Sequence, residues 1–421
     1  MARPNVQIKV IDESLVAPIG ETESPGIGAM VSIQNLIGEL GVTGEKQSGL
    51  MLVETINDWY GKLRTHTENY LKGLSASYWT GLTLQGAIGV CAASYVDVSS
   101  GATGWKPWAY EWWGVHNFLQ YGGRCYIGGT GTDAGYSVRT NSLSASSLVF
   151  DVIFQGATSG ATADSDPYAA DVKTVVEAKK NSDFPVLGVV HAGEVTATVK
   201  INSTSDEYYV NVAGHKYHLN PTGQGLLDSS KLIMTNLAPD VAGCITRTDR
   251  DSFPWFSPAG RVRGRILNVV RLLNNPTVSQ QDTLYDAGIN PVVTFPGEGT
   301  VLFGDKTGAA DTSTLSRINV SRLFIYLRKI ISPIARSILF EINDETTRAN
   351  FRIAAFGVLD RIRGQRGITD FRIICDETNN PPELVQARLF QADILVKPTI
   401  AINYVRITFT NKNLYDNLDQ A

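Results

Sequence analysis

The sequence predicts a mixed α/β protein, of the α+β kind, that is built from more than one domain. Its 421 residues are enough for two to three domains at ~150 residues each. With 43% hydrophobic and 19% charged residues, the chain can bury sizeable cores and does not belong to the disordered class. Segments with the apolar period of a helix occur beside segments that alternate as strands do.

The chain opens with a segment that alternates as a β-strand does. Val6, Ile8 and Val10 are separated by polar residues, which places the three apolar side chains on one face. Pro25 and Gly26 then interrupt the pattern. Residues 1–20 are therefore predicted to form an extended β-arm that is separate from the rest of the chain.

Residues 21–240 are predicted to form an outer domain, and its first part carries both kinds of signal. Strands are expected at 29–33 and 50–54, and a helix begins near Asn57 or Asp58. A second helix places three apolar side chains on one face and ends at Gly122-Gly123, before a strand at 124–127. These side chains are Trp112, Val115 and Leu119.

Residues at about 136–235 are predicted to form a β-rich insertion in this outer domain. Ser, Thr, Ala, Gly and Asp dominate its first part, and strand-like segments occupy its second. The insertion contains His215 and His218, a spacing that can ligate zinc. In a strand, however, these two side chains point to opposite faces, so no metal site is expected.

Residues 241–403 are predicted to form an inner domain with the most regular patterns. A helix has Leu323, Leu327 and Ile330 on one face until Pro333 disturbs it. A second helix can be capped by Asn343 or Asp344 and stopped by Gly364 and Gly367. Its apolar stripe is Phe351, Ala355, Val358 and Ile362. Two strands come next, in "TDFRIICDET" and "ADILVKP".

Residues 404–421 contain a second terminal strand pattern. Val405, Ile407 and Phe409 alternate with polar residues, so a C-terminal β-arm is expected. A strand alone in water is unstable, so each arm needs a sheet to join.

The glycine-rich segment at 290–307 does not have the spacing of a nucleotide site. Gly299 and Gly304 are separated as in a P-loop, but Asp305 stands between Gly304 and Lys306. The intervening residues are β-branched and apolar, as in a strand. Two short strands at 292–295 and 300–303, joined through a Pro296-Gly297 turn, are expected instead.

The sequence shows no constellation that would carry catalysis, so no enzymatic activity, metal or cofactor is predicted. It has neither a Gly-x-Ser-x-Gly nor a His-Glu-x-x-His motif. Cys375 ends an apolar strand beside two acids, which raise a thiol pKa rather than activate it. The four cysteines are far apart, which indicates free thiols.

No signal peptide and no membrane span are expected, since the chain lacks the apolar segments that either requires. The net charge of −4 argues against a nucleic-acid partner.

Several long motifs of the second half occur in one order and closely resemble the C-terminal part of contractile-tail sheath proteins. This family is found in tailed bacteriophages and related contractile injection machines. The resemblance covers residues 238–410, and in the first half "FLQYGGRCYI" and "INDWYGKL" match more loosely. The motifs are "APDVAGCITRTDRDSFPWFSPAG", "NPVVTFPGEGTVLFGDKT", "RINVSRLFIYLRKII", "GQRGITDFRIICDETNN" and "ADILVKPTIAINYVRITF".

The resemblance implies a structural subunit that polymerises around a rigid inner tube and contracts to drive the tube through a target cell envelope. Its partners would be further copies of itself, in a helical stack of six-fold rings, together with the tail tube protein and the baseplate and tail terminator proteins. Neither nucleic acid nor membrane insertion is implied. The protein would lie in the contractile tail of a virion, after synthesis in the cytoplasm of the host bacterium.

The resemblance also implies that the terminal arms link subunits, each arm adding a strand to the sheet of a neighbouring subunit. Arg261, Arg263 and Arg265 alternate beside glycines, and a strand would point all three one way. We interpret them as a contact with another subunit or with the tube, through pairing with carboxylates.

The alternative is a carbohydrate- or receptor-binding tail or fibre component. It is based on the tryptophan-rich stretch at 105–113 and on the β-rich insertion. Helical spacing of the tryptophans favours a core position instead.

Overall fold

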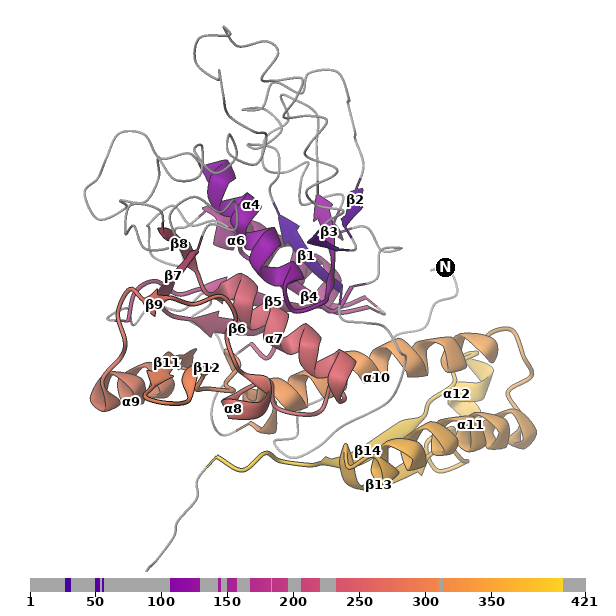
Figure 1. Ribbon diagram of the computed structural model, residues 1–421. Helices are drawn as coiled ribbons and strands as arrows, with labels where there is room; N and C mark the ends of the chain where they lie inside the picture. The colour runs from indigo at the N-terminus through magenta and orange to yellow at the C-terminus, as the bar shows by residue number, and fades with distance from the viewer. Residues whose placement is uncertain are drawn as a thin grey trace, which may run out of the picture.

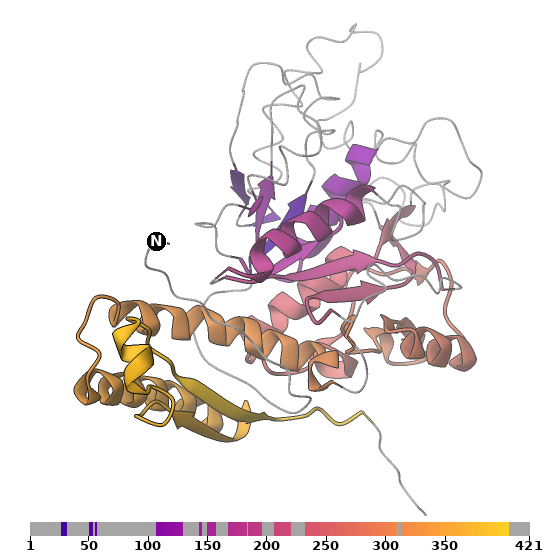
Figure 2. The same ribbon diagram turned by 180° about the vertical axis from the view of Figure 1, so that it is seen from behind.

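The computed structural model describes residues 27–31, 50–53, 55–56, 107–128, 143–144, 150–156, 167–182, 184–195, 206–219, 232–309 and 313–403. Figures 1 and 2 show it from opposite sides. The fold is mixed α/β, as predicted.

The largest sheet in the described part of the chain has seven strands, in the order β10-β6-β5-β4-β1-β3-β2 (Figure 1). Neighbouring strands run parallel, except that β2 pairs antiparallel with β3. Strands buried on both faces are continuous apolar runs, and β4, β5 and β6 are buried along their whole length. The strands are β1 (Ile27–Val31), β2 (Leu50–Val53), β3 (Arg124–Gly128), β4 (Val152–Phe154), β5 (Leu187–His191), β6 (Tyr209–Val212) and β10 (Ile289–Asn290).

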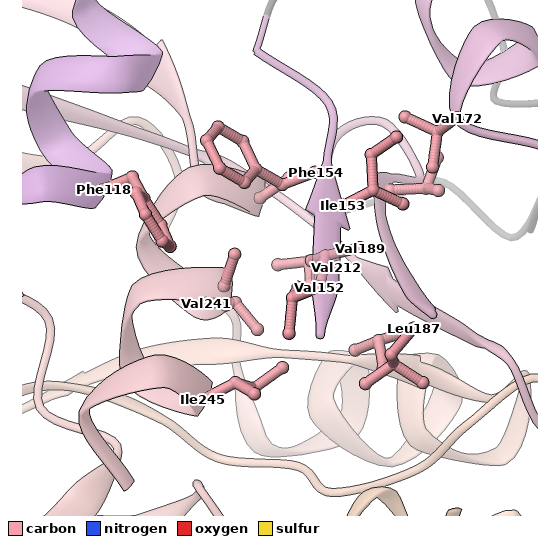
Figure 3. Packing of buried hydrophobic residues seen from close by; sticks show 14 of the residues in the cluster. Phe118, Val152, Ile153, Phe154, Val172, Leu187, Val189, Val212, Val241 and Ile245 are labelled. Carbon is pink, nitrogen blue, oxygen red and sulfur yellow. The ribbon is translucent and has the colours of Figure 1, made fainter. Parts of the chain in front are cut away.

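Helices cover both faces of this sheet. Helices α4 (Pro107–Leu119) and α7 (Ala238–Asp251) pack together on one face, and α6 (Pro167–Lys180) packs on the other. Alternation along β4 decides which residue faces which helix (Figure 3). Phe154 points toward α4 and stacks on Phe118 with the ring centroids 4.8 Å apart, whereas Ile153 points toward Val172 of α6.

Two smaller sheets lie beside the large one. In the first, β7 (His215–Leu219) runs antiparallel to both β8 (Leu232–Asn236) and β9 (Arg271–Leu272). The second is a hairpin of β11 (Val292–Phe295) and β12 (Gly299–Leu302). The hairpin confirms the two strands predicted on either side of Pro296-Gly297. Gly297 has a φ of 77°, which its missing Cβ allows.

Two short helices flank these strands. Helix α8 spans Gly260–Arg263, and helix α9 spans Val278–Asp286. Helix α9 begins with a capping box, in which the Thr277 side chain accepts from the backbone of Gln280 and the Gln280 side chain accepts from the backbone of Thr277.

A long helix, α10 (Ile318–Ser337), comes after the one-turn η2 (Thr314–Ser316) and leads into the C-terminal module, which we define as residues 338–398. This module lies beside α10 on the side away from the large sheet (Figures 1 and 2). It contains α11 (Glu345–Gly364), β13 (Ile368–Ile374), α12 (Pro382–Gln386) and β14 (Asp393–Pro398). The second predicted helix and both predicted strands are thereby confirmed, and Asp344 is the N-cap, accepting from Thr347 N at 2.8 Å.

Helix α10 has two buried sides. Ile318 and Ile325 belong to the main core under the large sheet. Leu323, Tyr326 and Ile330 belong to a second core, which they share with the C-terminal module.

The disturbance expected at Pro333 does not end the helix. Helix α10 continues through Pro333 to Ser337. Ile334 and Ala335, directly after the proline, pack in a third cluster around Phe351 and Cys375. This packing holds the last turn in helical form although proline supplies no backbone donor.

The segment predicted as a β-rich insertion, 136–235, contributes to the large central sheet instead of forming a separate addition to the outer domain. It contains helix α6, which was not predicted. Its strands β4 and β5 lie inside the seven-stranded sheet, between β1 and β6. The main core also joins residues on both sides of position 240, from Val53 to Ile325. The domain limits at 20, 240 and 403 stay a prediction.

Candidate assembly interface

Strands β13 and β14 form a two-stranded antiparallel sheet with one covered face. Their register pairs Phe371 with Val396 and Ile373 with Ile394. These four side chains pack in the second core, against Leu359 and Ile362 of α11 and Leu323 and Tyr326 of α10. Alternate residues of both strands therefore point toward the helices.

Among the described residues, the other face of this small sheet is uncovered and both of its edges are unpaired. Arg372, Leu395 and Lys397 are exposed on the strands. Among the described residues, β13 pairs only with β14 and β14 only with β13. An unpaired edge presents backbone donors and acceptors that can pair with a further strand. The sheet can therefore accept a strand on each side.

The chain leaves this sheet along a short strap, residues 399–403, that is tied at both ends. At its start, Thr399 N donates to Gly367 O at 3.1 Å. At its end, Asn403 Nδ2 donates to Tyr285 Oη at 3.1 Å and to Asp305 Oδ1 at 3.3 Å. The last described residue is thus anchored near α9, away from the end of β14.

The residues predicted as inter-subunit arms lie outside the described residues. These are Val6, Ile8 and Val10 at one end and Val405, Ile407 and Phe409 at the other. Their role stays a prediction.

The strand predicted for Arg261, Arg263 and Arg265 is wrong. Gly260 has a φ of 84°, and the backbone then forms the single turn of α8. Arg261 is exposed and pairs with Glu298 at 3.0 Å. Arg263 is half-buried, with Nε donating to Ser257 O at 2.7 Å, and the Arg265 backbone forms a bridge with Val301. The three side chains therefore do not share one face, and their contact role is untested.

The glycine-rich hairpin does not form a phosphate site. Lys306 and Thr307 are buried, and the Lys306 ammonium lies 4.2 Å from the centre of the Tyr285 ring. Thr307 Oγ1 donates to Leu315 O at 2.7 Å. Asp305 accepts from Tyr285 and Arg317. These groups hold the segment after the hairpin against α9 and against the residues that lead into α10.

His215 and His218 lie on opposite sides of β7, as predicted. His215 contacts Glu194, and its ring lies 4.5 Å from that of His191. His218 packs against Trp113 at a ring distance of 5.1 Å. Among the described residues, no group of three or more His, Cys, Asp or Glu side chains could hold a metal ion.

The three described cysteines, Cys125, Cys244 and Cys375, are buried thiols that form no disulfide with one another. Burial raises the pKa of the Cys375 thiol to about 11 and that of the Cys244 thiol to about 12. A nucleophilic cysteine needs the thiolate, which these surroundings disfavour.

Within the described part of the chain, no helix is long and apolar enough to cross a membrane.

Sequence analysis missed a set of buried ion pairs that tie α10 and β7 to the body. Lys329 pairs with Asp151 next to β4, and Arg322 pairs with Asp249 of α7. Lys216 of β7 pairs with Asp240 of α7 at 2.7 Å, and both side chains are fully buried. The available signal for the first two pairs was the spacing of Arg322 and Lys329, which are seven residues apart and so lie on one side of the helix beside the apolar stripe.

Comparison with known proteins places the C-terminal region in a family. Residues 310–412 match the family model described as the phage tail sheath C-terminal domain. The tail sheath protein of Vibrio phage KVP40 is 39% identical over 232 residues, which cover 50% of this chain and 35% of that protein. The tail sheath protein of Enterobacteria phage T4 is 42% identical over 173 residues, covering 41% of this chain and 26% of that protein. The match therefore spans about a third or less of the length of these relatives.

Solved structures show the same fold over nearly the whole chain. A chain in the baseplate of the anti-feeding prophage has a TM-score of 0.62 at 14% identity, covering 98% of this chain and 100% of that chain. A chain in the contracted sheath complex of the extracellular contractile injection system PVC has a TM-score of 0.62 at 13% identity, covering 98% of each chain.

Proposed function

This chain is a relative of the phage tail sheath proteins and carries their C-terminal domain, and from that premise we propose that it is the structural subunit of a contractile tail sheath. The subunit polymerises around a rigid inner tube and contracts to drive the tube through a target cell envelope. Its work comes from new contacts between subunits rather than from catalysis.

One observation carries this proposal: the β13–β14 sheet has two edges that no other described strand pairs with, in a chain whose sequence alternates as a strand does near each terminus. A strand added to either edge would place its apolar residues on the face that α11 covers. There it would extend the core around Phe371 and Val396. The polar residues between them would lie on the open face, beside Arg372 and Lys397. The alternation of both arms fits this placement.

The strap supports exchange of the C-terminal arm between copies. Asn403 is held at Tyr285 and Asp305, five residues beyond the end of β14. An extended chain covers ~3.3–3.6 Å for each residue, so the arm begins its course well away from its own sheet. Its natural acceptor is the sheet of a neighbouring copy.

The free energy gained when one strand joins a neighbour's sheet is large enough to keep two subunits attached. A strand of about six residues forms about five backbone hydrogen bonds, each contributing ~0.5–1.5 kcal/mol, and also buries three apolar side chains. Two arms on each subunit would keep neighbours attached while their bodies change orientation.

The other parts of the proposal are based on the relatives. The partners are further copies in a helical stack of six-fold rings, the tail tube protein, the baseplate and the tail terminator. The location is the contractile tail of a virion, after synthesis in the bacterial cytoplasm. The phage relatives favour this function over a carbohydrate-binding component. Trp113 of the tryptophan-rich stretch is 1% exposed, so it serves the core.

Removal of the arms tests the proposal. Deleting residues 1–14, or changing Ile407→Pro, should leave a soluble protein with the melting temperature of the wild type that forms no tubes by negative-stain electron microscopy. Proline removes one ladder donor, and Ile407→Val is the matched control that keeps it. A variant with a lowered melting temperature that still forms normal tubes would show that the arms fold back on their own subunit.

A further inference from the structure

An exposed apolar group lies at the far end of the C-terminal module. We call it the tip and define it as Phe340, Glu341, Ile342 and Leu389. Phe340 is 86% exposed, Ile342 77% and Leu389 54%. Large apolar side chains gathered at this exposure mark a site of interaction.

The tip has a fixed backbone. Asn343 Nδ2 donates to Leu389 O at 2.8 Å, which joins the loop after α10 to the loop after α12. Glu341 N donates to Ile338 O, and Leu389 N donates to Leu384 O. Beneath the loops, Ile338 and Phe390 pack in the cluster around Phe351. The apolar side chains are therefore presented by an ordered support.

Phe340 also has a strained conformation. Its φ is 73°, in the left-handed region that a bulky side chain rarely adopts. Local strain of this kind is found where a surface has a use.

A second exposed surface carries arginine side chains beside an exposed apolar one. We call it the α8 turn and define it as Arg261, Val262 and Arg265. Val262 is 85% exposed, and the neighbouring Arg261 side chain is 69% exposed and pairs with Glu298 of the same copy. In the tip, Glu341 is exposed between Phe340 and Ile342 and has no ion-pair partner among the described residues. The two surfaces are alike in apolar character, and the charge of Glu341 is opposite to that of the exposed Arg265.

The two surfaces cannot meet within one copy. The α8 turn lies near the start of α10, and the tip comes directly after its last turn (Figures 1 and 2). Since α10 has 20 residues, it holds the two surfaces about 30 Å apart. A contact between them joins two copies through different surfaces, and repetition of such a contact gives a ring or a helical filament.

We propose that the tip of one copy docks on the α8 turn of a second copy, with Phe340 and Ile342 against Val262 and Glu341 paired with Arg265, or with Arg261 in exchange for Glu298. The proposal rests on the proposed function for its biological setting, since it names a second contact within the same assembly. The contact is small, and the arms compensate by holding neighbouring copies at a high effective concentration.

Cysteine cross-linking tests the contact directly. Ile342→Cys and Val262→Cys place one thiol on each surface, and wild-type protein is the control for the native cysteines. Treatment of a mixture of the two variants with a short bis-maleimide should give a covalent dimer that neither variant gives alone. The absence of this dimer from the mixture, at concentrations where wild-type protein associates or forms tubes, would overturn the proposal.

Charge exchange supplies an independent measurement. Glu341→Arg alone and Arg261→Glu alone should each lower the yield of assembled protein in sedimentation by at least several-fold, and the double variant should recover most of it. Glu377→Arg, which reverses another exposed acid of the C-terminal module, should have no such effect. If both single variants assemble normally, the contact is wrong and the sheath function stands. If the dimer forms but no preparation yields tubes, the sheath function is wrong and the contact stands.

Discussion

His116 of α4 is a buried neutral histidine. It is 4% exposed and packs edge-on against Trp113, with the ring centroids 5.1 Å apart. Burial, assisted by the nearby charge of Lys216, lowers the pKa of His116 to about 4. The side chain is therefore uncharged at pH 7, and protonation would place a second cation close to Lys216.

His116 should make the folded state sensitive to acid. The unfolded chain takes up this proton near pH 6.5 and the folded chain near pH 4. Between these values the unfolded state binds more protons, so acidification lowers the free energy of unfolding by up to ~1.4 kcal/mol for each pH unit. In His116→Gln, the melting temperature should fall less between pH 7 and pH 5 than in the wild type, as measured by calorimetry. A parallel fall in both proteins would contradict this origin.

At the scale of single residues, sequence patterns predict which side chains are buried better than they predict which side chains form ion pairs. The period of α10 showed its apolar stripe, and the opposite sides of His215 and His218 could be inferred from their spacing. The acceptors of Arg322 and Lys329 could not be predicted, because Asp249 and Asp151 lie 73 and 178 positions away. No local period carries information over that distance.

Helix α10 shows how packing can decide where an element ends. Local chemistry predicts a break at Pro333, yet the next turn is helical because Ile334 and Ala335 are packed against the C-terminal module. The exposed side chain of Pro333 itself contributes little to either core.

Replacement of this proline should therefore stabilise the protein. Pro333→Ala restores a backbone donor and a better helix former, and we expect a gain of ~1–3 kcal/mol. Thermal unfolding should show a higher melting temperature. The exposed helical position Ala354→Pro, in the middle of α11, is the opposite control and should lower it. An unchanged or lowered melting temperature in Pro333→Ala would mean that the last turn of α10 needs the proline.

Elements of the second half were predictable because each is continuous and strongly patterned. The hairpin at 292–302, helix α11 and strands β13 and β14 are all formed by neighbouring residues. Helix α6 was missed because it comes after a Ser-, Gly- and Ala-rich stretch, although Val172, Val175, Val176 and Lys179 have helical spacing and are buried. For the candidate interface, both strands were predicted. Their open edges were not, since an edge depends on which strands pair elsewhere.

At the scale of the whole molecule, helix α10 joins the large sheet to the C-terminal module, because it contributes side chains to the hydrophobic core of each. Residues from Val53 to Ile325 contribute to the main core, and α10 adds its other side to the second. The strand order of the large sheet could not be predicted, because the sheet contains segments that are more than 200 residues apart in the sequence, such as β1 and β10.

Limited proteolysis should reflect this organisation. First cuts are expected at the termini or within 156–170, where the sequence is rich in Ser, Gly, Ala and Asp. Residues 340–375 should be protected, because α11 and β13 bury Phe351, Leu359 and Ile368. Mass spectrometry of early fragments is the measurement. Early cleavage between 340 and 375 would show that the C-terminal module is not firmly packed.

The shared burial of α10 has a mechanical consequence. A pull on the β13–β14 edges enters the protein through α11 and reaches α10 without crossing an extended linker. From α10 it continues into the body by the Arg322–Asp249 and Lys329–Asp151 ion pairs, placed two helical turns apart. Two ion pairs at separate positions along one helix resist rotation of the helix as well as pulling along its axis. In the proposed assembly, such a subunit would transmit torque to its neighbours with little elastic loss, and its body would turn together with the linked strands.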